Sequence, residues 1–139
     1  MLHLAKLAVG IRDIAHLAEV QAERQHTRPP LRHLTRNFPR RAEEVLDGGS
    51  LYWVIGGVMQ VRQRILDIRE DHWNDGTKCT ALVLDPTLVA LVPRLTRAFL
   101  GWRYLAAAAP PDRAATAAAQ GEEALPPKLR RDLQGLGLL

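Results

Sequence analysis

The stretch RRAEEVLDGGSLYWVI, residues 40–55, decides the fold because it joins a short helix to a buried strand. Pro39 precedes it and is favoured in the first turn of a helix, while Gly48 can take the left-handed conformation that ends one. From Ser50 to Ile55 the chain is apolar or aromatic at nearly every position. Because both faces of such a strand avoid water, we expect it to be covered from two sides.

The residues before this stretch indicate a strand followed by a helix. LHLAKLAVG, residues 2–10, has the apolar content of a strand and ends at a glycine. The period then changes, since Ile14 and Leu17 are spaced to share one helical face and Asp13 is a favourable N-cap. We therefore expect a helix over residues 13–25 that lies on a sheet.

The residues after the stretch indicate a hairpin. VMQVRQRILDI, residues 58–68, alternates between an apolar face and a polar face. The apolar face holds Met59, Val61 and Ile65, and the polar face holds Gln60, Arg62 and Arg64. A β-bulge near residues 65–66 would explain the later change of phase. WNDGTK, residues 73–78, is a turn of residues that tolerate left-handed backbone, and CTALVLD, residues 79–85, is its returning strand.

Three further segments have extended character, namely residues 31–38, 87–94 and 97–105. Together with the elements above they predict a single α+β domain over residues 1–105. We expect a small, mixed and curved sheet of five or six strands, or a partial β-barrel, packed by two helices. Residues 106–139 are rich in alanine and proline, and we expect a flexible tail with one short helix around residues 127–134.

Length, cysteine content and hydropathy restrict the class of protein. The chain has 139 residues and one cysteine, Cys79, so it can form no internal disulfide and no cysteine-rich zinc site. No apolar run reaches the roughly 20 residues that cross a bilayer. Lys6 and Asp13 interrupt the N-terminal apolar stretch where a secretory signal would be unbroken. We expect a cytoplasmic protein in which Cys79 is a small buried hydrophobe.

The positive charge is local. The net charge is +4, and 16 of the 19 basic residues are arginine, a bias that GC-rich coding also produces. However, residues 24–42 hold six arginines and no acidic residue. This segment therefore has a positive field of its own, which favours an anionic partner.

No catalytic or metal-binding motif stands out. Ser50 lacks the second glycine of a nucleophile elbow, and Cys79 has only His72 nearby as a base. The histidines show no zinc-ligand spacing, and the DHWNDG segment lacks calcium ligands at key positions. We expect no metal and no cofactor, and we expect binding rather than catalysis.

Arginines and aromatic residues together suggest a nucleic-acid surface. Guanidinium groups neutralise phosphates, and exposed aromatic rings stack on unpaired bases. The candidate binding residues are Arg36, Arg40, Arg41, Arg62, Arg64, Trp102 and Arg103. The sequence therefore predicts a non-enzymatic module that binds RNA, single-stranded or structured, or a nucleotide. Trp53 alternates with apolar neighbours, so we expect it in the core.

Two other functions stay open. An enzyme acting on a small anionic metabolite could use Glu43 or Asp47 as a base beside the same arginines. A protein-interaction domain would instead expose Phe99, Trp102 and Tyr104 in one apolar patch.

The chain also resembles a known family. The segments LHLAKLAVG, TRNFPRRAEEVLDGGSLYWVI, VRQRILDI, LVLDP and RAFLGWRYL are together similar to domain of unknown function 1489, a bacterial domain found in alphaproteobacteria. The resemblance covers residues 2–105 and implies no activity. The predicted fold is more loosely similar to PUA and ASCH pseudo-barrels, which bind RNA or modified nucleobases. The glycine-lysine-glutamate-arginine signature of ASCH domains is absent here.

Overall fold

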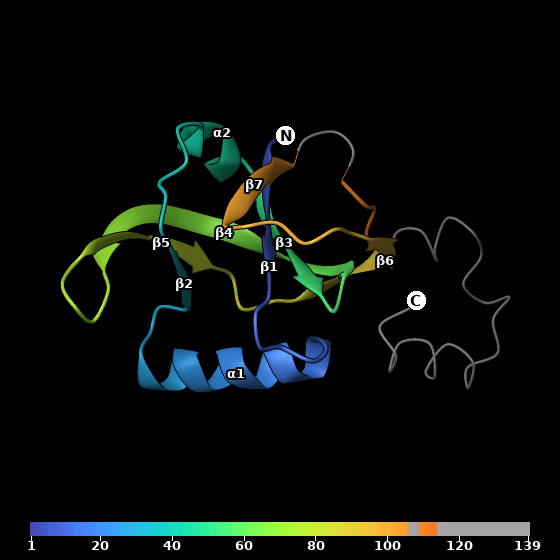
Figure 1. Ribbon diagram of the computed structural model, residues 1–139, viewed down its shortest axis with the longest axis horizontal. Helices are drawn as coiled ribbons and strands as arrows, with labels where there is room; N and C mark the ends of the chain where they lie inside the picture. Colours follow the sequence, from blue (N-terminus) through green and yellow to red (C-terminus); the bar gives the residue numbers. More distant parts are fainter. Residues whose placement is uncertain (106–108, 114–139) are drawn as a thin grey trace, which may run out of the picture.

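A curved mixed sheet with a helix at each end forms the fold (Figure 1). The computed structural model describes residues 1–105 and 109–113. Its helices are α1 (Ile14–Thr27) and α2 (Ala42–Leu46), and its strands are β1 (His3–Leu7), β2 (Arg32–Thr35), β3 (Ser50–Ile55), β4 (Val58–His72), β5 (Lys78–Leu84), β6 (Val89–Leu95) and β7 (Trp102–Leu105). The predicted α+β class is confirmed, with seven strands where five or six were expected.

The sheet bends toward a barrel without closing. Its strand order is β2-β5-β4-β3-β1-β7, and β6 pairs with β4 beside this path. Strands β5 and β6 pair with successive halves of the long β4. Among the strand pairs of the described residues, only β1–β3 is parallel. In Figure 1, α1 runs beneath the ends of β1 and β2, and α2 lies at the opposite end.

Local sequence signals set the helix boundaries. The Asp13 carboxylate caps α1 by accepting a hydrogen bond of 2.7 Å from the backbone N–H of His16. Helix α2 ends near Gly48, which has a φ of +89° as predicted. Gly49 then passes so close to other backbone that a Cβ there would lie 2.3 Å from the carbonyl oxygens of Leu2 and Val45.

Strand β3 lies at the centre of the protein, and all its residues are buried, as predicted. Two clusters cover its two faces. The larger cluster includes Leu4, Leu17, Val45, Leu51, Trp53, Ile65 and Leu82, and the smaller one includes Ala5, Tyr52, Val54, Met59 and Leu91. The burial of Trp53 and of Cys79 confirms their predicted roles as core residues.

Strand β4 confirms one prediction and corrects another. The register shift between Ile65 and Asp67 confirms the predicted bulge. The prediction that Met59 and Val61 share a face is wrong, because they belong to different core clusters. The pairing of β4 with β6 shifts register between Met59 and Val61, and this irregularity turns their two side chains to opposite faces of the sheet.

Residues 109–113 pack back onto the sheet. The backbone N–H of Val92 donates to the carbonyl of Pro111, and Asp112 forms an isolated bridge with Leu91. The side chain of Asp112 also pairs with Arg62, at 2.7 Å. The rest of the predicted tail, including its short helix, lies outside the described residues.

Within residues 1–105 and 109–113, neither helix combines the length and hydropathy that crossing a membrane requires.

Candidate functional site

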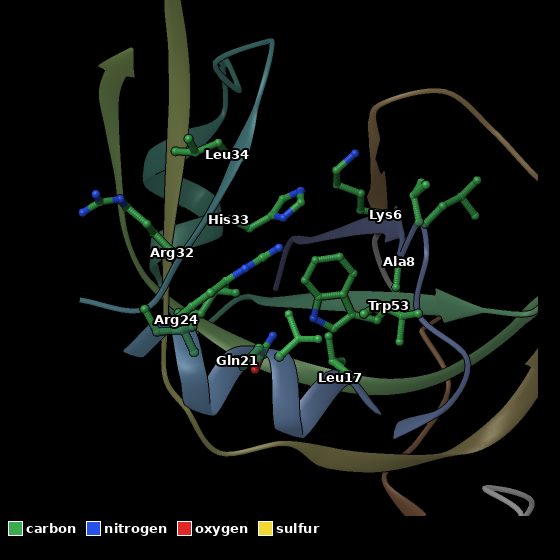
Figure 2. A pocket seen from close by; sticks show the side chains of 15 residues that line it. Lys6, Ala8, Leu17, Gln21, Arg24, Arg32, His33, Leu34 and Trp53 are labelled. Carbon is green, nitrogen blue, oxygen red and sulfur yellow. The ribbon is translucent and has the colours of Figure 1, made fainter. Parts of the chain in front are cut away.

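A pocket of about 200 Å³ lies between the end of β1 and β2 and against α1. The end of β1 and its loop form one wall, β2 forms the opposite wall, and α1 closes the base. Figure 2 shows the side chains that line it. They include Lys6 from β1, Arg24 from α1, and Arg32 and His33 from β2. The pocket thus joins segments that are far apart in the sequence.

A buried polar network holds the base of this pocket in place. The indole Nε1–H of Trp53 donates to Oε1 of Gln63 at 2.8 Å. Gln21 and Gln63 exchange two amide hydrogen bonds of 2.7 Å, and Gln63 also donates to the carbonyl of Asp85 at 3.1 Å. Gln63 is fully buried, so each of its partners depends on it for a hydrogen bond. The network therefore fixes α1 against the sheet.

The pocket is cationic and contains no acid. Lys6, Arg24 and Arg32 line it, and none of its lining residues is aspartate or glutamate. Arg32 has Asp71 at 3.5 Å. Lys6 and Arg24 have no ion pair within the described part of the chain. Burial lowers the pKa of Lys6, because the ammonium loses part of its hydration. Lys6 and Arg24 therefore lack a negative charge that would compensate their own.

His33 lies between these cations as a neutral ring. Its ring meets Trp53 edge to face, with centroids 5.0 Å apart. Burial, with smaller contributions from Lys6 and Arg24, lowers the pKa of His33 to about 3. Its Nε2 atom is buried and has no hydrogen-bond partner among the described residues. A neutral imidazole with a free nitrogen can therefore receive a polar ligand group at this point.

A second pocket of about 320 Å³ adjoins the first and shares Arg24, Arg32 and His33 with it. Arg28 and Trp73 complete its polar and aromatic lining, and again no acidic residue is present. Trp73 lies at the β4–β5 turn and is 37% exposed. In Figure 2, the guanidinium of Arg24 points from α1 toward His33, at the region common to both pockets.

Two of the arginines predicted to bind an anion are paired with carboxylates. Arg41 makes two hydrogen bonds to Glu44, which lies three residues later. Arg62 makes two hydrogen bonds of 2.7 Å to Asp112 and a third, of 3.0 Å, to the hydroxyl of Ser50. These guanidinium groups already have the negative partner that a phosphate would supply.

The other predicted arginines are more available. Arg36 and Arg40 are exposed between β2 and α2, and Arg64 is exposed on β4. None of these three has an ion pair within the described residues. Arg103 packs its guanidinium over the ring of Phe99, 4.4 Å from the centroid. The structure places all four on the surface, outside the lining of the two pockets.

The aromatic residues of β7 hold the loop before α2. Trp102 donates from Nε1 to the carbonyl of Asn37 at 2.8 Å, and the hydroxyl of Tyr104 accepts from the backbone N–H of Arg41 at 3.1 Å. Trp102 and Tyr104 pack against the larger core cluster, whereas Phe99 packs against the smaller one. They do not form the single apolar patch that a protein-interaction domain was expected to show.

The acids considered for catalysis lie on another element. Glu43 is exposed on α2, and Asp47 is exposed at its C-terminal end. Neither lines the two pockets. Across the described residues, no group of three or more His, Cys, Asp or Glu side chains gathers in a way that could hold a metal ion.

Sequence reasoning missed the residues that line the pockets, although one signal was present. Arg24, Arg28 and Arg32 belong to the same acid-free segment, residues 24–42, that drew attention to Arg36, Arg40 and Arg41. Their spacing of four residues crosses a helix end and a strand, so only the fold brings them together. Lys6 and His33 carried no signal of their own.

Comparison with known families agrees with the resemblance seen in the sequence. The family model described as protein of unknown function (DUF1489) matches residues 4–139. The chain belongs to the DUF1489 family. No curated protein and no solved structure matches it significantly. The looser resemblance to PUA and ASCH domains stays a prediction.

Proposed function

We propose that this DUF1489 protein is a binding module for nucleotides, including the terminal nucleotide of a single-stranded RNA, and that the site is the double pocket between α1 and β2. The observation that carries the proposal is one of charge. Lys6, Arg24, Arg28 and Arg32 line two adjoining pockets whose linings contain no carboxylate. Arg32 also has Asp71 at 3.5 Å, but Lys6 and Arg24 have no ion pair within the described residues. A phosphate group would supply the negative charge that these two lack, and arginine forks match its oxygens.

The second pocket favours a nucleotide over a simple anion. Trp73 offers a partly exposed indole beside Arg28 and Arg32. An aromatic ring next to guanidinium groups is the combination that stacks a base while holding its phosphate. The neutral His33 and the apolar wall of the first pocket then suit an uncharged part of the same ligand.

Binding without catalysis is the simpler function for this site. The lining of both pockets contains no serine, threonine, cysteine, aspartate or glutamate. A carboxylate base or a hydroxyl or thiol nucleophile would therefore have to come from outside the linings.

Titration of the protein with adenosine and uridine monophosphate and with a short single-stranded RNA tests the proposal. Calorimetry or fluorescence anisotropy should detect binding that weakens as salt increases. Arg24→Gln removes a charged contact shared by both pockets, and we expect the Kd to rise about tenfold, equivalent to about 1.4 kcal/mol. Trp73→Ala should weaken the base-containing ligands while leaving inorganic phosphate unaffected.

The matched control is the pair Arg40→Gln and Arg41→Gln at the start of α2. These arginines belong to the surface predicted from the sequence. The two sets of variants therefore distinguish binding in the pockets from binding at that surface. Loss of binding in the Arg24 variant alone supports the pocket. Loss in the Arg40 and Arg41 variant alone overturns the pocket and assigns binding to the exposed arginines. Absence of any salt-dependent binding overturns both.

A further inference from the structure

The side chain of Lys6 has a different chemistry from the arginines around it, because an amine can form a covalent bond with a carbonyl group. We propose that Lys6 is a reactive lysine that forms a reversible imine with anionic aldehydes or ketones entering the first pocket. The inference rests on the proposed anion site, since the anionic group of the ligand would be held by Arg24. It adds a carbonyl-bearing ligand class that the arginines do not select.

The position of Lys6 fits this chemistry. On β1, Lys6 is paired in register with Trp53 of β3 on one side and with Trp102 of β7 on the other. Lys6 lines the first pocket, and its ammonium has no carboxylate partner in the described part of the chain. Desolvation by burial lowers the pKa of Lys6 and so favours the uncharged amine, which is the nucleophile in imine formation.

His33 and Arg24 provide the other elements. Arg24 points into the same pocket toward His33 (Figure 2), where its guanidinium can hold a phosphate or carboxylate. The unpartnered Nε2 of His33 is buried in the β2 wall beside them. A carbonyl oxygen bound near this nitrogen can exchange a proton with it.

The reaction needs no oxidant or reductant. The nitrogen lone pair of Lys6 attacks the carbonyl carbon, a C–N bond forms, and the carbonyl oxygen becomes a hydroxyl by taking a proton from the nitrogen. Loss of that hydroxyl together with the second amine proton, as water, leaves the C=N double bond. Hydrolysis by the same steps in reverse restores the lysine.

The experiment uses pyridoxal phosphate, an aldehyde that carries a phosphate, followed by borohydride to reduce any imine to a stable amine. Mass spectrometry of the digested protein then assigns the label. The chain contains only three lysines, Lys6, Lys78 and Lys128, so the comparison is simple. Lys78 is exposed at the start of β5 and serves as the internal reference. We expect Lys6 to be labelled several-fold faster than Lys78, because desolvation lowers the pKa of Lys6 and leaves more of its amine uncharged.

Variants and competitors make the result specific. Lys6→Arg keeps the positive charge but should abolish the rapid labelling, and the matched Lys78→Arg variant should keep it. Circular dichroism melting of both variants confirms that they are folded. Arg24→Gln, or excess inorganic phosphate, should slow labelling of Lys6 several-fold, whereas pyridoxal without the phosphate should react slowly from the start.

The outcomes distinguish this inference from the proposed function. Equal labelling of Lys6 and Lys78 overturns the reactive lysine, even if nucleotides bind. Fast labelling of Lys6 that is indifferent to phosphate and to Arg24→Gln overturns the anion-directed form of the inference and weighs against the phosphate site itself. Fast labelling that nucleotides and phosphate both suppress supports the two proposals together.

Discussion

The rings of His33 and Trp53 meet edge to face, with centroids 5.0 Å apart, although β2 and β3 are separated by β5 and β4 in the strand order. The contact therefore crosses the inside of the curved sheet. It brings a strand at the edge of the sheet onto the central strand and forms the corner of the first pocket. Curvature of the sheet thus produces the candidate site.

The stability of this corner should depend on Gln63. Gln63→Leu removes the acceptor of the Trp53 indole N–H and both hydrogen bonds of the Gln21 side-chain amide. These buried polar groups are then left without partners. We expect the free energy of unfolding to fall by about 2–4 kcal/mol. Urea denaturation measures it. Gln60→Leu is the control, because Gln60 is only half-buried and makes one side-chain bond, to the carbonyl of Ile55. An equal fall in the free energy of unfolding in the two variants would contradict the stabilising role of the Gln63 network.

Protonation of His33 should link stability to pH. The folded protein holds the pKa of His33 at about 3, well below its ordinary value of 6.5. Between these values the unfolded chain binds more protons than the folded one, so stability should be complete above pH 6.5 and should fall as the pH is lowered toward 3. Unfolding midpoints measured across this range test it. His33→Gln should reduce the slope, and His26→Gln at the exposed end of α1 should keep it. Titration of the His33 ring near neutral pH, followed by NMR, would refute the prediction.

The ion pair between Arg62 and Asp112 should attach residues 109–113 to the sheet. Arg62 lowers the pKa of Asp112 mainly through their hydrogen bonds, so this stabilisation is present above the ordinary carboxyl range and is lost as the pH falls through the folded pKa. Asp112→Asn should destabilise the protein by about 1–2 kcal/mol at neutral pH. The exposed pair of Asp67 and Arg69 offers the comparison, since Asp67→Asn should cost less than about 1 kcal/mol. Proteolysis after residue 105 should also accelerate in the Asp112 variant alone.

Gly49 should tolerate no side chain. A Cβ would lie 2.3 Å from two backbone carbonyl oxygens, those of Leu2 and Val45, and neither can move without shifting β1 or α2. We expect Gly49→Ala to lower the free energy of unfolding by about 3 kcal/mol, the upper end for an overpacked site. Thermal unfolding provides the measurement. At Gly56 there is open space around the added carbon, so Gly56→Ala should cost only about 1 kcal/mol from its left-handed backbone. A milder effect at position 49 than at 56 would be inconsistent with this packing.

Sequence alone determined the elements whose causes are local. The cap at Asp13, the helix end at Gly48, the β4–β5 turn and the bulge after Ile65 all follow from residues close together in the chain. The fully buried β3 also followed from its composition, because an apolar run on both faces requires cover on both sides.

Only the tertiary structure decided where the charges meet. Whether an arginine is free or paired depends on partners distant in the chain, as Arg62 and Asp112 show. The double pocket exists because the curved sheet does not close between its edge strands β2 and β7, and α1 lies across the ends of β1 and β2. Lys6, Arg24 and His33 come together there by sheet curvature, a long-range property that no local pattern in the sequence records.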